Sequence, residues 1–194
     1  MKKDIILSGV GGQGILSVAS IIGLAALENG LFVKQAEVHG MSQRGGAVQS
    51  HLRISSNEVA SDLIPFGEAD VILSVEPLES LRYLPYLSTN GWIITNTAPF
   101  VNITDYPEMD KLLAQIRSYK NVVAIDADKI AKRINSPKAS NVVILGAASP
   151  YLGIPYENLE NGIRKLFGRK GEELINMNLS ALKAGIDIIN IKIT

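Results

Sequence analysis

The chain has 194 residues, of which 46% are hydrophobic and 20% are charged, so it can bury one sizeable core in the manner of ordinary globular proteins. Lysine plus arginine equals aspartate plus glutamate at 19 each, which excludes a whole-chain field that would attract nucleic acid or an anionic membrane surface. The absence of cysteine excludes disulfides, thiolate-bound iron–sulfur clusters and a cysteine nucleophile within this chain.

Targeting and metal signals are also missing from the sequence. No apolar run approaches the ~20 residues that span a bilayer, and the N-terminus enters a short predicted strand without a cleavable signal pattern. The two histidines, His39 and His51, have no spaced carboxylate motif around them, so a zinc site is not expected. We therefore expect a cytoplasmic protein that borrows any redox cofactor from a partner.

The first elements predict a strand, a helix and a second strand. Residues 4–8, with an apolar run at residues 5–7, predict a strand; residues 12–29 predict a helix that ends at Gly30, and residues 32–36 predict the next strand. Between the first strand and the helix lies a glycine-rich turn that matches G-x-G-x-x-G through Gly9, Gly11 and Gly14. Such a turn suits an anion, because glycines let a ligand approach the backbone and the helix N-terminus supplies free N–H donors.

The later elements continue the alternation and then become helical. Residues 47–54 alternate, with Gln49, His51 and Arg53 on one face, which predicts an edge or half-exposed strand and a half-exposed His51. Further strands are predicted at residues 71–75, 92–95 and 122–125, and helices at residues 76–87, 108–119, 128–134, 140–152, 157–167 and 171–189. Glu76 and Asp126 suit helix N-termini.

These elements predict an α/β fold: a single domain over residues 1–194, built on an open, mainly parallel, Rossmann-like sheet with helices on both faces and a helical C-terminal section. Ligands in such sheets bind at the carboxyl ends of the strands. That edge would gather the glycine turn, the loop over residues 37–46, Glu76 and Asn96.

The glycine turn alone leaves its ligand open. It can bind a dinucleotide, a coenzyme A phosphate or a carboxylate, or it can serve only close packing of helix and strand. Glu37 lies 23 residues after Gly14, where an NAD-dependent dehydrogenase places the acid that holds the ribose.

The loop over residues 37–46 is dense in polar donors around three glycines, which is typical of a binding loop. Arg44 can fork onto a phosphate or a partner carboxylate, or it can brace the loop by pairing with Glu37 or Glu76. For His39 a structural or interface role is expected, since no serine or cysteine nucleophile accompanies it.

Residues 8–14 (SGVGGQG) together with residues 37–46 (EVHGMSQRGG) carry a resemblance to a known family. Residues 64–70, 76–79, 84–87 and 96–97 extend it over nearly the whole chain. The chain resembles the gamma-type domain of 2-oxoacid:ferredoxin oxidoreductases. The resemblance implies an enzyme that oxidatively decarboxylates an aryl pyruvate such as indolepyruvate, yields an acyl-coenzyme A and passes electrons to ferredoxin; pyruvate, 2-oxoglutarate and branched-chain 2-oxoacids are the alternative substrates.

The resemblance also implies a division of labour. Thiamine diphosphate and the iron–sulfur clusters belong to a larger partner subunit, and this chain is the non-cofactor subunit, inactive alone and able to form a homodimer when isolated. It implies no catalytic residue here and a contact with coenzyme A, the substrate or the partner. The residues expected to make that contact are Gly9, Gly11, Gly12, Gln13, Gly14, His39, Met41, Ser42, Gln43 and Arg44. A purely structural interaction module, with an empty glycine turn, is the remaining alternative.

Overall fold

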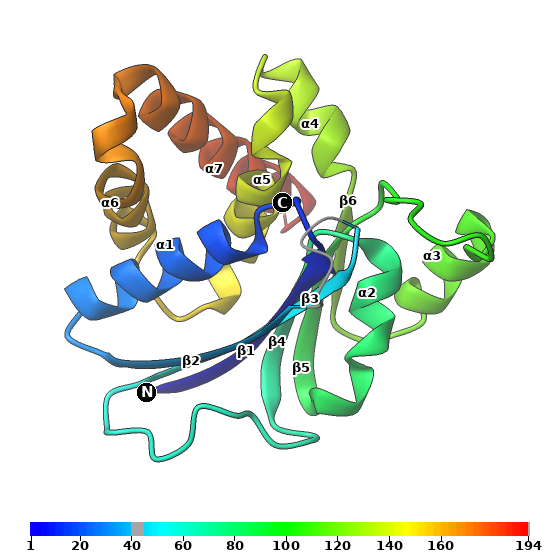
Figure 1. Cartoon of the computed structure of the whole chain (residues 1–194), viewed down its shortest axis with the longest axis horizontal. Coiled ribbons are helices and arrows are strands. Elements are labelled where there is room, and N and C mark those ends of the chain that lie inside the picture. The colour runs from blue at the N-terminus through cyan, green and yellow to red at the C-terminus, as the bar shows by residue number, and fades with distance from the viewer. Residues whose placement is uncertain (40–44, 194) are drawn as a thin grey trace.

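Six strands form one sheet, shown in Figure 1 with its covering helices. The structure is a computed structural model, and it describes residues 1–39 and 45–193. The strand order across the sheet is β2-β3-β1-β4-β5-β6. The strands are β1 (Lys2–Val10), β2 (Phe32–His39), β3 (Ala47–Ser55), β4 (Ala69–Ser74), β5 (Leu87–Asn96) and β6 (Val122–Ile125).

The strand directions confirm a mainly parallel sheet. β1, β4, β5 and β6 pair in parallel, whereas β3 is antiparallel to both of its neighbours, β1 and β2. β2 therefore runs in the same direction as β1, but β3 separates the two strands.

The prediction that residues 47–54 form an edge or half-exposed strand is wrong. β3 lies inside the sheet, and its polar side chains His51 and Arg53 have hydrogen-bond partners within the protein. The Arg53 guanidinium forms two hydrogen bonds with the buried Asp4 carboxylate, at 2.8 and 3.1 Å, and two with the carbonyl oxygens of Ser61 and Leu63. The polar residues that alternate along β3 therefore face an internal hydrogen-bond network and not solvent.

His51 is buried and not half-exposed, contrary to the sequence prediction. Its Nδ1 accepts a hydrogen bond from the backbone N–H of Ile64 at 3.0 Å, and its ring contacts Tyr86 edge-on. His51 and Arg53 together hold the loop between β3 and β4 against the sheet.

Helices cover both faces of the sheet, as predicted (Figure 1). One face carries α1, α5, α6 and α7, with α4 beside them, over a core that includes Ile5, Leu7 and Leu73. The other face carries α2 and α3 near a smaller core around Ile6 and Ile72. The helices are α1 (Ile15–Glu28), α2 (Pro77–Arg82), α3 (Met109–Arg117), α4 (Ala127–Arg133), α5 (Ser140–Ala148), α6 (Tyr156–Phe167) and α7 (Glu172–Ile193). None of these helices, over the residues described, has the length and apolar character needed to cross a membrane.

Several predicted helices begin or end at other residues, and two of these differences have a plain backbone cause. α1 begins at Ile15 rather than Gly12, because Gly12 and Gly14 have positive φ values of 101° and 77° that a right-handed helix does not admit. α2 ends at Arg82 rather than residue 87, because Pro85 cannot donate the next helical hydrogen bond. A short 3₁₀ turn (Leu84–Tyr86) follows α2, and β5 starts directly after it.

Candidate functional site at the carboxyl edge of the sheet

The glycine turn continues the sheet before it enters α1. Gly11 donates its N–H to the carbonyl of Gly46 at 2.8 Å, and Gly45 donates to the carbonyl of Gly11 at 3.3 Å. These bonds extend the pairing of β1 with β3 by one step. The glycine turn is therefore hydrogen-bonded to the end of the loop over residues 37–46.

Not every glycine of the turn is open to a ligand. Gly9 belongs to β1, and a Cβ there would lie 2.5 Å from the Val75 side chain, so this glycine serves packing. Gly12 is exposed, and a Cβ there would meet no atom within 4 Å. Only Gly12 combines a left-handed backbone with open space in front of it.

Two side chains brace the turn from within. The Gln13 side-chain oxygen accepts a hydrogen bond from the Val10 N–H at 2.8 Å, which holds the turn closed. Asn141 of α5 donates to the Gly14 carbonyl at 3.1 Å. Gln13 therefore braces the turn through its side-chain oxygen.

The start of α1 has neither a side-chain cap nor an acidic residue in its first turn. Gly14 is the N-cap residue and provides no side-chain hydrogen bond to the first turn of the helix. The first turn contains no acidic side chain that would repel an anion. The positive end of the helix dipole is thus directed at the carboxyl edge of the sheet.

Glu76 is a hub of hydrogen bonds at the same edge and is only 1% exposed. Its Oε2 accepts from the Glu79 N–H at 2.9 Å, which caps α2 as predicted. Its Oε1 accepts from the Phe100 N–H at 3.3 Å and from the Tyr106 hydroxyl. One carboxylate therefore fixes both the start of α2 and the segment of residues 97–107, which we call the strap.

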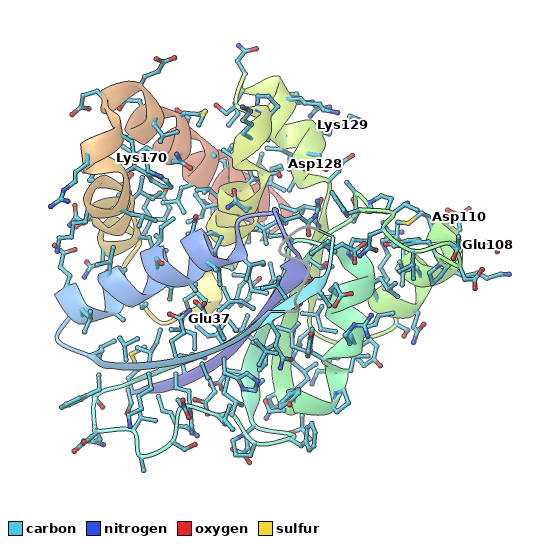
Figure 2. All side chains as sticks on the ribbon, in the orientation of Figure 1. Glu37, Glu108, Asp110, Asp128, Lys129 and Lys170 are labelled. Carbon is cyan, nitrogen blue, oxygen red and sulfur yellow. The ribbon has the colours of Figure 1, made fainter. Side chains whose placement is uncertain are left out.

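The strap reaches back to the glycine turn. Asn102 donates its side-chain amide to the Gly45 carbonyl at 2.7 Å, and Gly45 is paired with Gly11. Its exposed apolar side chains are Phe100, Val101 and Ile103. Figure 2 shows Glu108 and Asp110 at the start of α3, where the strap ends. The edge thus combines the glycine turn with an adjacent exposed apolar segment.

Burial shifts the pKa values of Glu79 and Tyr106, which lie around Glu76. Burial raises the pKa of the Glu79 carboxyl above its usual value, although the Arg82 guanidinium 2.9 Å away opposes this shift. Burial and the hydrogen bond to Glu76 raise the pKa of Tyr106. Tyr106 therefore remains a neutral hydrogen-bond donor to Glu76 at every physiological pH.

The remaining predicted residues fall in two groups. Met41, Ser42, Gln43 and Arg44 lie outside the described residues, so the choice between a ligand contact and a brace for Arg44 stays a prediction. His39 is the last residue of β2.

Glu37 does not lie where an acidic residue would bind the ribose of NAD. Glu37, labelled in Figure 2, lies on β2. β3 separates β2 from β1 and the glycine turn. Its carboxylate accepts a hydrogen bond from the Gln35 amide on the same strand. In a dinucleotide fold the acid ends the strand beside the glycine turn, so the topology argues against a ribose role for Glu37.

Sequence reasoning missed the strap and its anchors. Tyr106 lies 30 residues from Glu76, and Asn141 lies 127 residues from Gly14, so no local spacing links them. Asn96, predicted at this edge, accepts hydrogen bonds from the N–H groups of Ala98 and Ala127. Within residues 1–39 and 45–193, no cluster of three histidine or acidic side chains could hold a metal ion.

Comparison with known proteins identifies the family. Residues 4–188 match the family described as pyruvate ferredoxin/flavodoxin oxidoreductase. The chain belongs to this family. The match covers nearly the whole chain and confirms the resemblance found from the two glycine-rich segments.

Within the pyruvate ferredoxin/flavodoxin oxidoreductase family, the chain is similar to proteins named indolepyruvate oxidoreductase subunit IorB. It is 39% identical to that of Archaeoglobus fulgidus, over 95% of this chain and 94% of the relative. It is 38% identical to that of Thermococcus kodakarensis, over 96% of both chains. Both relatives are named as subunits of an oxidoreductase.

The fold is also that of a solved family member. The 2-oxoglutarate:ferredoxin oxidoreductase of Magnetococcus marinus, solved with 2-oxoglutarate, coenzyme A and succinyl-CoA bound, superposes with a TM-score of 0.76 at 22% identity. The alignment covers 98% of this chain but 31% of that chain. The fold described here thus occurs as one part of a longer oxidoreductase polypeptide.

Proposed function

We propose that this chain, as one gamma-type domain over residues 1–194, is the non-cofactor subunit of a 2-oxoacid:ferredoxin oxidoreductase acting on indolepyruvate or a related aryl pyruvate. The observation that carries the proposal is the identity of 38–39% with subunits named for indolepyruvate, over almost the full length of both chains. The partner subunit supplies thiamine diphosphate and the iron–sulfur clusters, and electrons leave to ferredoxin.

The glycine turn is proposed to bind an anionic group of coenzyme A. Gly12 is open and left-handed, and the N-terminus of α1 has no capping or acidic side chain in front of its donors. Phosphates are suited to such a site because backbone N–H groups donate without a side chain in between. Coenzyme A in the Magnetococcus marinus enzyme is consistent with this assignment.

The strap is proposed to face the partner subunit. Val101 is 67% exposed and Ile103 is 47% exposed, although Glu76 and Asn102 hold the strap in one conformation. A fixed, exposed apolar segment beside a binding turn is typical of an interaction surface. The chain would then complete the cleft in which coenzyme A meets the partner's cofactor.

Substrate class is tested with the purified two-subunit enzyme. The rate of viologen reduction with coenzyme A is compared for indolepyruvate, phenylpyruvate, pyruvate and 2-oxoglutarate. The highest kcat/KM is expected for an aryl pyruvate. A preference for pyruvate or 2-oxoglutarate would reject the aryl assignment, and an NAD-dependent activity of the chain alone would reject the subunit assignment.

The glycine turn is tested by Gly12→Glu, with Gly67→Glu as the matched control. Both glycines have a positive φ and open space around them, but Gly67 precedes β4 at the opposite end of the sheet. Because a carboxylate at position 12 repels an anion, Gly12→Glu should raise the KM for coenzyme A about tenfold, or about 1.4 kcal/mol. An equal change in both variants would show a loss of stability rather than of binding.

The strap is tested by Val101→Lys, with Ile191→Lys near the end of α7 as the control. Both side chains are more than half exposed, so neither variant should unfold the chain. Val101→Lys should abolish co-purification of the larger subunit, whereas Ile191→Lys should not. Normal co-purification of Val101→Lys would place the partner elsewhere.

A further inference from the structure

Within residues 1–39 and 45–193, the outer edge of β2 is not paired with another strand. β2 (Phe32–His39) is the terminal strand of the sheet and contains no proline or glycine. Its one described partner is β3. An edge of this length exposes a row of backbone donors and acceptors, which folded proteins normally protect.

Lys34 does not shield this edge from pairing with another chain. Lysine on an edge strand commonly blocks pairing with another chain. Lys34, however, donates its ammonium group to the Ala60 carbonyl at 3.1 Å and so lies over the loop that follows β3. Meanwhile Phe32 is 50% exposed and Val38 is 54% exposed, so the edge carries two apolar side chains.

From this edge we infer that β2 pairs with β2 of a second copy of this chain, antiparallel and centred on Gln35. The proposal is independent of the substrate and of the glycine turn. It specifies which surface joins two copies and in which register.

Symmetry limits the registers. Residues directly opposite each other in an antiparallel pair lie on the same face, and a two-fold axis perpendicular to the sheet preserves each residue's face. The axis must therefore pass beside one residue, which faces its own copy. A centre at Lys34 or at Glu37 would oppose two like charges, which is unfavourable.

The centre at Gln35 uses both exposed apolar residues. Phe32 then lies opposite Val38 of the second copy, and this contact occurs twice because of the symmetry. Lys34 lies opposite Ala36, so no like charges meet. The two Gln35 side chains lie beside each other at the axis, and within each copy the Gln35 amide nitrogen donates to Glu37 and to Ser50. A centre at Ala36 would instead put Lys34 opposite Val38 and leave Phe32 without an apolar partner.

Disulfide trapping tests the register directly. The chain has no cysteine, so a single introduced thiol is unique. Opposite residues have Cα atoms about 4.5–5.5 Å apart, within the range of a disulfide. Gln35→Cys should therefore form a covalent dimer of the full chain under mild oxidation.

Two controls separate this register from random collision. With Phe32→Cys alone the two thiols would lie about 20 Å apart along the strands and should not join, whereas Phe32→Cys combined with Val38→Cys should join. If Ala36→Cys forms the disulfide faster than Gln35→Cys, the Gln35 register is rejected. In the holoenzyme, the Gln35→Cys variant should also form a disulfide between two copies of this chain. If no disulfide forms there, this contact is rejected.

Mass in solution provides a second test. Sedimentation should give the full chain twice the mass of one copy, and Val38→Lys should reduce it to the mass of one copy. Ile191→Lys is the matched control, because that side chain is also exposed but lies on α7. A wild-type chain that stays at the mass of one copy, or a Val38→Lys variant that stays at twice that mass, would overturn the proposal.

Discussion

Tyr106 donates its phenolic hydrogen bond to Glu76, a carboxylate almost completely removed from solvent, and this contact ties the strap to the start of α2. The same carboxylate oxygen accepts the Phe100 N–H, so the strap is held at two points. The order of the strap, and with it the position of Asn102 beside Gly45, depends on this one acidic side chain.

Removing the hydroxyl of Tyr106 should loosen the strap. Because hydrogen bonds to charged groups are worth about 1.5–3 kcal/mol, Tyr106→Phe should lower the free energy of unfolding by about 2 kcal/mol. Amide hydrogen exchange over residues 97–107 should become faster. Tyr119→Phe, at an exposed tyrosine, is the control and should change stability by less than about 0.5 kcal/mol. Unchanged exchange in Tyr106→Phe would mean that the strap is held without this bond.

The buried ion pair of Asp4 and Arg53 predicts that removing one partner destabilises the protein far more than removing both. The Asp4 side chain is 1% exposed, so Arg53→Met would leave a buried carboxylate with only the more exposed Lys2 as a charged partner. The free energy of unfolding should fall by about 3–5 kcal/mol. The double variant Asp4→Leu with Arg53→Met should regain much of this loss, because no charge then remains buried. Urea denaturation measures both, and Lys2→Met serves as the control at the exposed partner.

The crossing of α5 and α7 depends on two glycines. A Cβ at Gly185 would lie 2.1 Å from the Val143 carbonyl oxygen, and a Cβ at Gly146 would lie 2.0 Å from that of Leu182. Gly185→Ala should therefore lower the free energy of unfolding by about 1–3 kcal/mol, since the helices must move apart. Gly168→Ala is the matched control, because it has space for a Cβ and an ordinary φ. Thermal unfolding of the two variants should differ clearly, and equal midpoints would contradict the close contact.

His51 predicts that stability falls in mildly acidic solution. Burial lowers the pKa of the His51 imidazole below its usual 6.5, with Arg53 adding to the shift and Asp62 opposing it. The unfolded chain therefore binds a proton more readily than the folded chain. Stability from this group is complete above pH 6.5 and is lost as the pH falls below that value toward the folded pKa.

The measurement is the free energy of unfolding of the wild type and of His51→Gln between pH 7.5 and pH 5. The decline with falling pH should be shallower in His51→Gln, because glutamine does not titrate there. The variant should also be less stable at pH 7.5, since the Ile64 N–H loses its acceptor. Parallel pH profiles would exclude His51 as the source.

Much of the fold could be predicted from local patterns along the chain. The apolar runs at residues 5–7 and 71–73 lie in strands because both faces of these strands are buried. Glu76 and Asp126 cap helices in the structure, since a carboxylate three residues ahead of a free N–H is a local arrangement. Gly12 and Gly14 mark the turn because only glycine adopts a positive φ there at low cost.

The order of the strands could not be predicted in the same way. Residues 47–54 predict a strand, but not that it inserts between β1 and β2. Which strands become neighbours depends on pairing between segments far apart in the chain, and the alternation of polar residues in β3 is compatible with water or with an internal partner. Asp4 and Arg53 are 49 residues apart, and only their pairing distinguishes the two.

For the candidate site too, one part could be predicted from local sequence and another part could not. The glycine turn follows from residues 9–14 alone, because backbone conformation and helix polarity are local properties. Its surroundings do not: Asn141, Tyr106 and Asn102 approach the edge from elements that the chain reaches much later. Local sequence predicts the glycine turn and its free backbone, whereas the packing of distant segments determines which side chains fix the turn and leave Gly12 open.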